Sequence, residues 1–200
     1  MKRLHRPDLY AWSAFDEARD IDFHSVLWHR PGEGNVAIDP LPLSAHDRRH
    51  VEALGGVAVI VVTNSDHTRG AEALASWSGA EVLVPRAEHA TMPVAACEPV
   101  GEGDDRVRGL RIFELEGSKT AGELALLLED HTLVFGDLVR AHRANEIHLL
   151  PPEKLRDVVA ARASLRRLLA FESVEALLLG DGWSVFRDGH ARLRALLEAP

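Results

Sequence analysis

The sequence has a single cysteine and no long apolar run, and each shortage excludes a class of protein. Cys97 is the only cysteine among the 200 residues, so no internal disulfide can form and a reducing cytoplasm is the expected location. No apolar run approaches the ~20 residues needed to span a bilayer. Residues 1–7 are basic but no apolar stretch follows them, so neither a membrane segment nor a signal peptide is expected.

Positive charge is also scarce. The chain has 23 Lys and Arg against 31 Asp and Glu, a net charge of −8, and it has no dense basic block, so a nucleic-acid partner is not expected. The short basic clusters at 140–143 and 162–167 are interpreted as solvated faces or pocket rims. A small-molecule substrate or ligand is the expected partner, and a homodimer is left open. The length and the 46% apolar fraction suit one globular domain over residues 1–200.

The chain is organised around residues 57–63, an unbroken apolar run that ends in Thr63 and predicts a strand buried on both faces. Helices are predicted from Ser44 to about Leu54, from near Thr68 to Gly79, after Pro152, and over 187–197. Strands are predicted over 10–15, 22–29, 35–39, 81–85, 110–115 and 174–179, with a hairpin of 124–128 and 132–135. Residues 86–109 read as irregular.

This order of elements predicts an α/β (α+β) fold. The hairpin segments must pair antiparallel, so two sheets packed together with helices outside fit better than one doubly wound sheet. Four polar turns follow apolar strands, at 64–69, 118–123, 136–137 and 180–181. Loops at one end of such sheets can converge, so these turns are expected to share one site.

Five segments in this order resemble the metallo-β-lactamase superfamily. They are residues 35–40, Thr63, 119–122, 133–137 and 179–182. The resemblance implies a four-layer αββα sandwich with two mixed sheets, and a hydrolytic site with one or two metal ions at one edge of the sheets.

The positions that the resemblance assigns to metal ligands are Asn64, Asp66, Thr68, Arg69, Lys119, Asp137 and Asp181. Only Asp137, at the bridging aspartate, keeps the family's residue. Asn64, Asp66, Arg69, Lys119 and Asp181 stand where the family has histidine, and Thr68 stands where it has aspartate. A standard dinuclear zinc site is therefore not expected.

Two ways of balancing the charge remain open. If the turns meet, Asp66, Asp137 and Asp181 repel one another, at about 4 kcal/mol for a pair ~4 Å apart with an effective dielectric of about 20. Lys119 and Arg69 are cations that do not normally ligate a metal, and they could neutralise the carboxylates. The other solution is one divalent ion, Mn²⁺, Mg²⁺ or Zn²⁺, held by ligands drawn from Asp66, His67, Asp137 and Asp181.

Three functions follow from these solutions. The first is a metal-dependent hydrolase of an ester, thioester, amide or phosphoester, with Asp66 or His67 as general base. The second is a non-catalytic binding protein whose metal is replaced by Lys119 and Arg69. The third is metal-free catalysis, in which Lys119 and Arg69 hold an anionic substrate and Asp66 is the base.

Asn64, His142 and Trp183 are candidates for the substrate pocket. Each site residue also has a structural alternative. Asp66 and His67 suit a helix start, and Lys119, His142 and His148 suit exposed loops. Trp183 suits core packing, as Trp12, Trp28 and Trp77 do.

Overall fold

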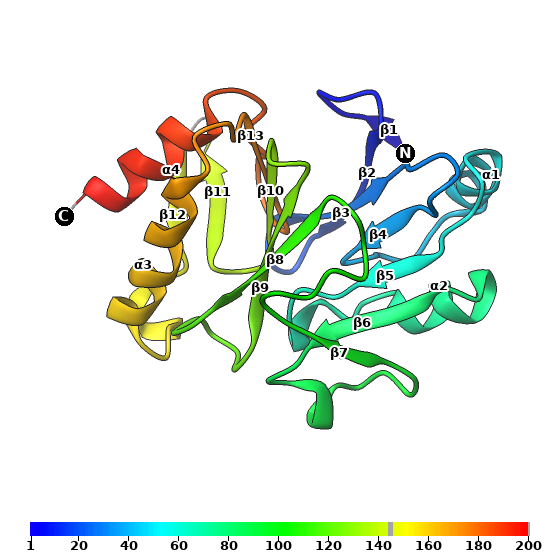
Figure 1. The fold of residues 1–200 in the computed structure, drawn as a ribbon, viewed down its shortest axis with the longest axis horizontal. Coiled ribbons are helices and arrows are strands. Elements are labelled where there is room, and N and C mark those ends of the chain that lie inside the picture. Colours follow the sequence, from blue (N-terminus) through cyan, green and yellow to red (C-terminus); the bar gives the residue numbers. More distant parts are fainter. Residues whose placement is uncertain (144–145, 200) are drawn as a thin grey trace. The chain divides into compact units, whose positions relative to one another are not determined.

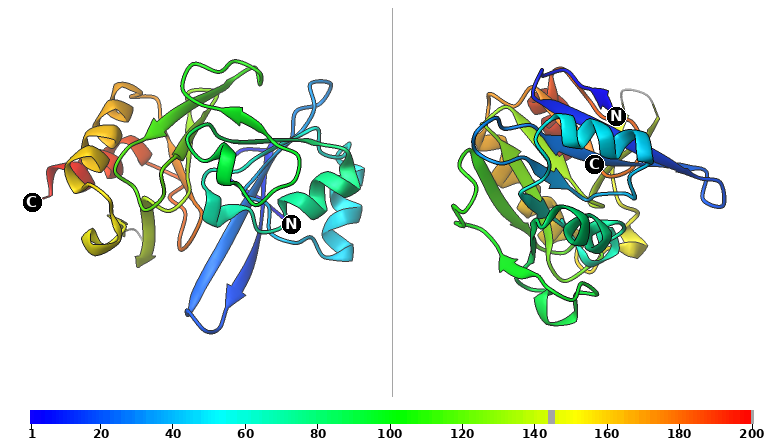
Figure 2. Two further views of the ribbon diagram at one scale, coloured as in Figure 1. Left: turned by 90° about the horizontal axis from the view of Figure 1, so that it is seen from below. Right: turned by 90° about the vertical axis from the view of Figure 1, so that its right-hand side faces the viewer.

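The computed structural model describes residues 1–143 and 146–199, and the chain divides into two compact units. The first unit is Met1–Val84 with Glu88–Pro99, and the second is Pro85–Ala87 with Val100–Pro200. Each unit is built on a mixed β-sheet (Figures 1 and 2). The two sheets confirm the predicted α/β class, whereas a single domain over residues 1–200 stays a prediction.

The sheet of the first unit follows the chain order from β1 to β7. Its strands are β1 (Lys2–Arg3), β2 (Leu9–Asp16), β3 (Ile21–Trp28), β4 (Val36–Ile38), β5 (Val59–Val61), β6 (Glu81–Pro85) and β7 (Glu98–Val100). Pairing is antiparallel from β1 to β4, then parallel from β4 through β5 to β6. The long hairpin of β2 and β3 extends beyond the neighbouring strands (Figure 2).

Helices α1 (Ala45–Ala53) and α2 (Ala71–Ser78) belong to this unit, with short 3₁₀ turns η1 (Ser65–His67) and η2 (His89–Thr91). Ser44 caps α1 by accepting from the amide of Asp47, as predicted, and α2 ends at Gly79 in the left-handed region. Ile60 and Val62 pack with Val51 and Leu74 in one core. The predicted start of α2 near Thr68 was early, since η1 covers residues 65–67 and α2 begins at Ala71.

The sheet of the second unit has the order β13-β10-β9-β8. Its strands are β8 (Leu110–Leu115), β9 (Glu123–Leu128), β10 (Thr132–Phe135) and β13 (Ala176–Leu179). The predicted hairpin is confirmed, since Thr132 pairs with Leu128 across an antiparallel ladder. β13 joins parallel to β10.

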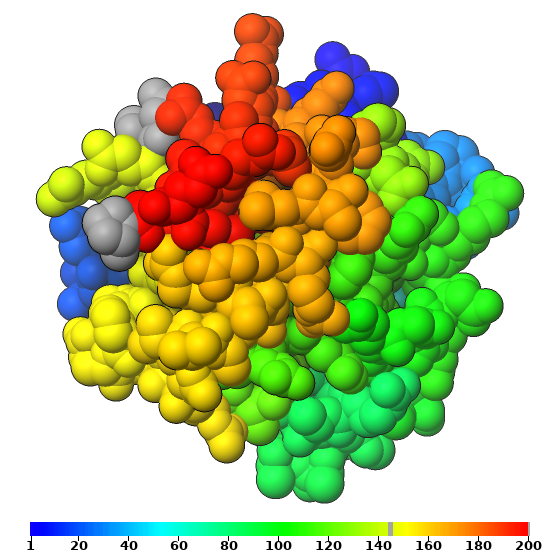
Figure 3. Space-filling view, turned by 60° about the vertical axis from the view of Figure 1, so that its left-hand side comes forward, coloured from blue at the N-terminus to red at the C-terminus, as the bar shows by residue number. Residues whose placement is uncertain are grey.

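Helices α3 (Val158–Arg167) and α4 (Gly189–Glu198) cover one face of this sheet (Figure 1). Leu165 and Leu193 pack with the sheet residues Phe113 and Leu127 in one core. The two helices lie side by side on the face in Figure 3, and Arg162 Nη2 donates to the Leu197 carbonyl at 2.8 Å. Short 3₁₀ turns η3 (Pro152–Lys154) and η4 (Leu168–Ala170) flank α3, which begins later than predicted because Asp157 caps it.

One loop prediction was wrong. The histidines after Asp137 were placed in an exposed loop, but this segment forms a small antiparallel sheet of β11 (Val139–Arg143) and β12 (Glu146–Leu149). Along the parts of the chain that the structure describes, no helix has the length and apolar content needed to cross a membrane.

Candidate functional site

Three of the four polar turns meet at one edge of the sheet in the second unit. β9 starts at Glu123, and β10 and β13 end at Phe135 and Leu179. β9 runs antiparallel to β10, and β13 runs parallel to it, so these three positions lie at the same edge. The Gly180 amide donates to the Phe135 carbonyl at 2.9 Å. The expected meeting of the turns at 118–123, 136–137 and 180–181 is therefore confirmed inside this unit.

Glu123 joins the first two of these turns, although the sequence did not single it out. Its side chain is buried. One carboxylate oxygen accepts from the amides of Asp137 at 2.8 Å and Leu138 at 2.7 Å, and the other accepts from Ser118 Oγ. Hydrogen bonds to an ionised acceptor are about twice as strong as neutral ones. Glu123 therefore fixes the backbone on which Asp137 stands.

Asp181 forms a two-pronged ion pair with Arg140. Arg140 Nε donates to Asp181 Oδ1 at 3.0 Å, and Nη2 donates to Oδ2. The side chains are only 12% and 2% exposed. Of the two solutions left open by the sequence, neutralisation by Lys119 and Arg69 or by a divalent ion, neither included Arg140, whose guanidinium holds both oxygens of Asp181. The sequence showed Arg140 only as part of a short basic cluster.

The turn that carries Asp181 is held against β11. Gly182 has a φ of 77°, and a Cβ there would lie 2.2 Å from the Ala141 carbonyl oxygen, so only glycine fits. The amide of Trp183 donates to the same carbonyl at 2.7 Å. The side chain of Trp183 is 63% exposed, so Trp183 is not a core residue.

Two histidines lie beside this ion pair. The rings of His142 and His148 have centroids 5.4 Å apart, and His142 Nε2 is 4.0 Å from Asp181 Oδ1. Burial lowers the pKa of both imidazoles, and the positive charge of Arg140 lowers both further. Both rings are therefore neutral at pH 7, and they can donate and accept hydrogen bonds.

In the first unit, the side chains of Asp39, Thr63 and His67 form a buried network. Asp39 Oδ1 accepts from the Thr63 amide at 2.7 Å, and Oδ2 accepts from Thr63 Oγ1 at 2.6 Å. His67 Nδ1 lies 2.7 Å from Oδ2. A carboxylate only accepts, so Nδ1 carries the proton in this pair. His67 lies in η1, just before α2, which agrees with its interpretation as a helix-start residue, but its side chain is buried rather than at the surface. Asp39, which lies in a segment used for the resemblance, was not recognised as its partner.

Three other predicted site residues lie in the same unit. Asn64 is buried, and its Oδ1 accepts from the amide of Asp66 at 2.9 Å. Asn64 is therefore the cap of η1, and Asp66 is exposed. Arg69 Nη1 donates to the His24 carbonyl at 2.9 Å, and its guanidinium lies 4.9 Å from the ring centre of Phe23.

These donors do not fit the metal centre that the resemblance implies. Within residues 1–143 and 146–199, no group of three or more His, Cys, Asp or Glu side chains is placed to hold a metal ion. Asp181 is held by Arg140, His67 Nδ1 is held by Asp39, and Lys119 is an exposed cation. Zinc prefers imidazole and thiolate ligands, and neither lysine nor arginine replaces them.

Comparisons with known proteins agree with the resemblance. A family model described as the metallo-β-lactamase superfamily matches residues 1–199. Among solved structures, a metallo-β-lactamase from Pontibacter korlensis has 16% identity and a TM-score of 0.72, covering 100% of this chain and 98% of its own. One from Erythrobacter litoralis, with β-mercaptoethanol in its active site, has 16% identity and a TM-score of 0.73, covering 96% and 93%.

A third is the enzyme FIM-1 from Pseudomonas aeruginosa in its mono-zinc form, with 12% identity and a TM-score of 0.70, covering 95% of this chain and 90% of its own. At these identities the likeness establishes the fold. A search of curated protein sequences gave no match.

Proposed function

The chain belongs to the metallo-β-lactamase superfamily, and from this premise we propose that it binds a small-molecule ligand without the superfamily's metal centre. Membership supports a hydrolase-type function. The proposal is that the residues at the metal-ligand positions now serve the protein's own internal contacts.

The ion pair between Arg140 and Asp181 carries this proposal. Asp181 stands at the family's last histidine position, and a guanidinium with both Nε and Nη2 on its carboxylate occupies the side on which a metal would bind. Displacing the guanidinium would break two charge-assisted hydrogen bonds and would leave the largely buried Arg140 in need of another partner. A metal ion would therefore have to compete with a partner already in place.

The chemistry around this pair indicates the kind of ligand. Trp183 presents an exposed ring, which suits stacking on a planar molecule. His142 and His148, neutral at pH 7, add hydrogen-bonding groups close to Asp181. A planar heteroaromatic compound with polar substituents matches both features.

A screen of planar heteroaromatic compounds by thermal shift tests the proposal. Tryptophan fluorescence then reports binding, because Trp12 and Trp28 are buried whereas Trp183 is exposed. We expect quenching that is lost in Trp183→Ala and kept in Trp77→Phe, the matched control. If Zn²⁺ or Mn²⁺ raises the melting temperature and none of the compounds does, the proposal is wrong.

The buried network of the first unit favours a second candidate function, metal-free hydrolysis. Asp39 holds His67 with Nδ1 protonated, and this leaves Nε2 as the nitrogen that gains a proton in general-base catalysis. A screen of ester, thioester and phosphoester substrates in the presence of a chelator tests this candidate. Activity that survives the chelator and is abolished in His67→Gln would favour it over simple binding.

A further inference from the structure

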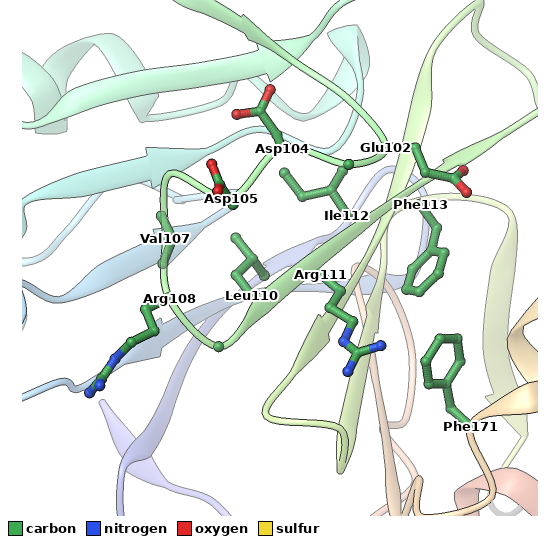
Figure 4. Close-up of a pocket in the computed structure, with 12 residues that line it drawn as sticks. Glu102, Asp104, Asp105, Val107, Arg108, Leu110, Arg111, Ile112, Phe113 and Phe171 are labelled. Carbon is green, nitrogen blue, oxygen red and sulfur yellow. The ribbon is translucent and has the colours of Figure 1, made fainter.

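The second unit has a pocket of about 520 Å³ that none of the predicted site residues lines. It is formed by the loop before β8, by β8 itself and by Phe171. Figure 4 shows Asp104, Asp105 and Val107 on one side of β8, and Arg111, Phe113 and Phe171 on the other. Arg108 also lies on the side of the two aspartates, with its guanidinium directed away from them, and Glu102 lies on the side of the aromatic rings. One side of the pocket therefore carries two aspartates and the other carries two aromatic rings, with β8 between them.

The strand between these sides is the free edge of its sheet. β8 is the last strand in the order β13-β10-β9-β8. The amide of Glu129 donates to the Gly109 carbonyl, and Arg111 pairs with Leu127 in the same ladder. Hydrogen-bonded pairs alternate in an antiparallel ladder, so the odd-numbered residues of β8 face β9. The backbone groups of Leu110, Ile112 and Glu114 therefore point away from the sheet.

At both ends of this edge, the outward backbone groups form hydrogen bonds within the protein. The Leu110 amide donates to the Val107 carbonyl at 3.0 Å, and the Glu114 carbonyl accepts from Arg167 Nη2 at 2.7 Å. Between them lie the Leu110 carbonyl, both backbone groups of Ile112 and the Glu114 amide. Within the described chain, these groups have no hydrogen-bond partner. They alternate acceptor, donor, acceptor and donor, which is the pattern that an added strand satisfies.

We propose that this edge binds an extended peptide segment of a partner protein, in which basic and apolar side chains alternate. Successive side chains of an added strand point to opposite faces, so one set would meet Phe113 and Phe171, and the other would meet the loop that carries Asp104 and Asp105. Glu102 and Asp104 in that loop are paired with arginines. Asp105 is exposed, and it has no ion-pair partner among the described residues. Asp105 therefore favours a basic side chain.

A second copy of the chain fits this edge less well. If β8 paired antiparallel with itself about Ile112, the partner's Glu114 would stand opposite Leu110. Leu110 lies on the same side of the strand as Asp105 (Figure 4), so the pairing would bring a second carboxylate towards Asp105, while Arg86 already pairs with Glu114 and Asp104 in each copy. Like charges that face each other across strands are destabilising.

Amide hydrogen exchange, resolved by residue in NMR spectra of the full chain, tests the edge directly. In the free protein, the amides of Ile112 and Glu114 should exchange faster than those of Arg111 and Phe113, which bond to β9. The probe is a ten-residue peptide that alternates Lys and Val, and at saturation it should slow both edge amides about ten-fold or more. Slow exchange of Ile112 and Glu114 in the free protein would overturn the proposal.

Fluorescence polarisation with the labelled peptide tests the ligand chemistry. Asp105→Lys should weaken binding of the Lys/Val peptide about three-fold, the size of one surface ion pair, and should strengthen binding of a Glu/Val peptide. Glu153→Lys is the matched control, because Glu153 is exposed in the same unit but does not line the pocket. The same Lys/Val peptide with N-methylated residues at alternate positions keeps both sets of side chains but lacks the backbone donors for the edge, and it should not bind.

Three results would refute the proposal. The first is that neither the Lys/Val nor the Glu/Val peptide binds. The second is binding that N-methylation of the peptide backbone does not disturb, which would mean that the backbone edge is not used. The third is protection of Ile112 and Glu114 that rises with protein concentration in the absence of peptide, which would make a second copy of the chain the occupant.

Discussion

Replacing Arg140 with methionine isolates the contribution of the ion pair to the second unit. Methionine keeps an unbranched apolar side chain of similar reach but removes the guanidinium that holds Asp181. The carboxylate of Asp181, only 2% exposed, is then buried without its countercharge. A broken buried ion pair typically costs about 3–5 kcal/mol, because the remaining charge is uncompensated.

This cost is measured as the change in the free energy of unfolding in urea, together with the melting temperature. A chain of this size loses about 2–4 °C for each kcal/mol. The expected fall in melting temperature is therefore roughly 6–20 °C. The double variant Arg140→Met, Asp181→Asn removes both charges and should recover part of the loss.

The matched control is Arg143→Met in the same strand. Arg143 and Glu146 are 83% and 66% exposed, and they lie 3.8 Å apart, so losing this pair should cost under about 1 kcal/mol. If Arg140→Met destabilises the protein no more than Arg143→Met does, the reasoning about the buried pair is refuted.

Three further predictions concern the networks around the site. Asp39→Asn should lower the free energy of unfolding in urea by about 1–3 kcal/mol, because the buried donors lose a charged acceptor, while asparagine still tolerates the left-handed backbone. Asp66→Asn, at an exposed position, should lower it little, and equal effects of the two variants would contradict the network. Glu123→Gln should also cost about 1–3 kcal/mol, because one amide oxygen replaces two carboxylate oxygens, and an unchanged unfolding curve would contradict this role. The pKa values of His142 and His148 are lowered in the folded chain, so below the ordinary value of 6.5 the unfolded chain binds more protons than the folded chain. The free energy of unfolding should therefore fall as the pH drops below about 6.5. Replacing both histidines with glutamine should flatten this dependence on pH, and an unchanged dependence would contradict the assignment.

The local sequence pattern predicted the helices and strands that have a strong hydrophobic periodicity or clear turn and capping residues at their ends. The apolar runs that form β9 and β10 flank the turn at 129–131, and the pairing of Thr132 with Leu128 follows from that turn. Segments that depend on distant contacts were missed. β11 carries Arg140 and His142, so it lacks clean alternation, and it is ordered through its bridge to Gly182 and its pairing with β12.

The candidate site was predictable only as a set of turns. The resemblance located Asp137 and Asp181, but the partner of Asp181 lies 41 residues away, and no local signal connects two such positions. The contact of His67 with Asp39 spans 28 residues, and Glu123 reaches the amide of Asp137 across 14. In each case the acceptor needs a hydrogen-bond donor because it is buried. Which distant residue supplies that donor depends on the folded chain, so the local sequence does not show it.

Metal content, measured by mass spectrometry on protein purified without chelator or histidine tag, tests the central claim most directly. The measurement is paired with thermal unfolding during titration with Zn²⁺ and Mn²⁺. We predict less than about a tenth of a metal ion per chain and no rise in melting temperature. An ion that did bind the native state would be easy to detect, because at 100 times its Kd it would stabilise the protein by about 2.7 kcal/mol. About one ion per chain, with a clear rise in melting temperature on adding the same ion, would contradict a metal-free site.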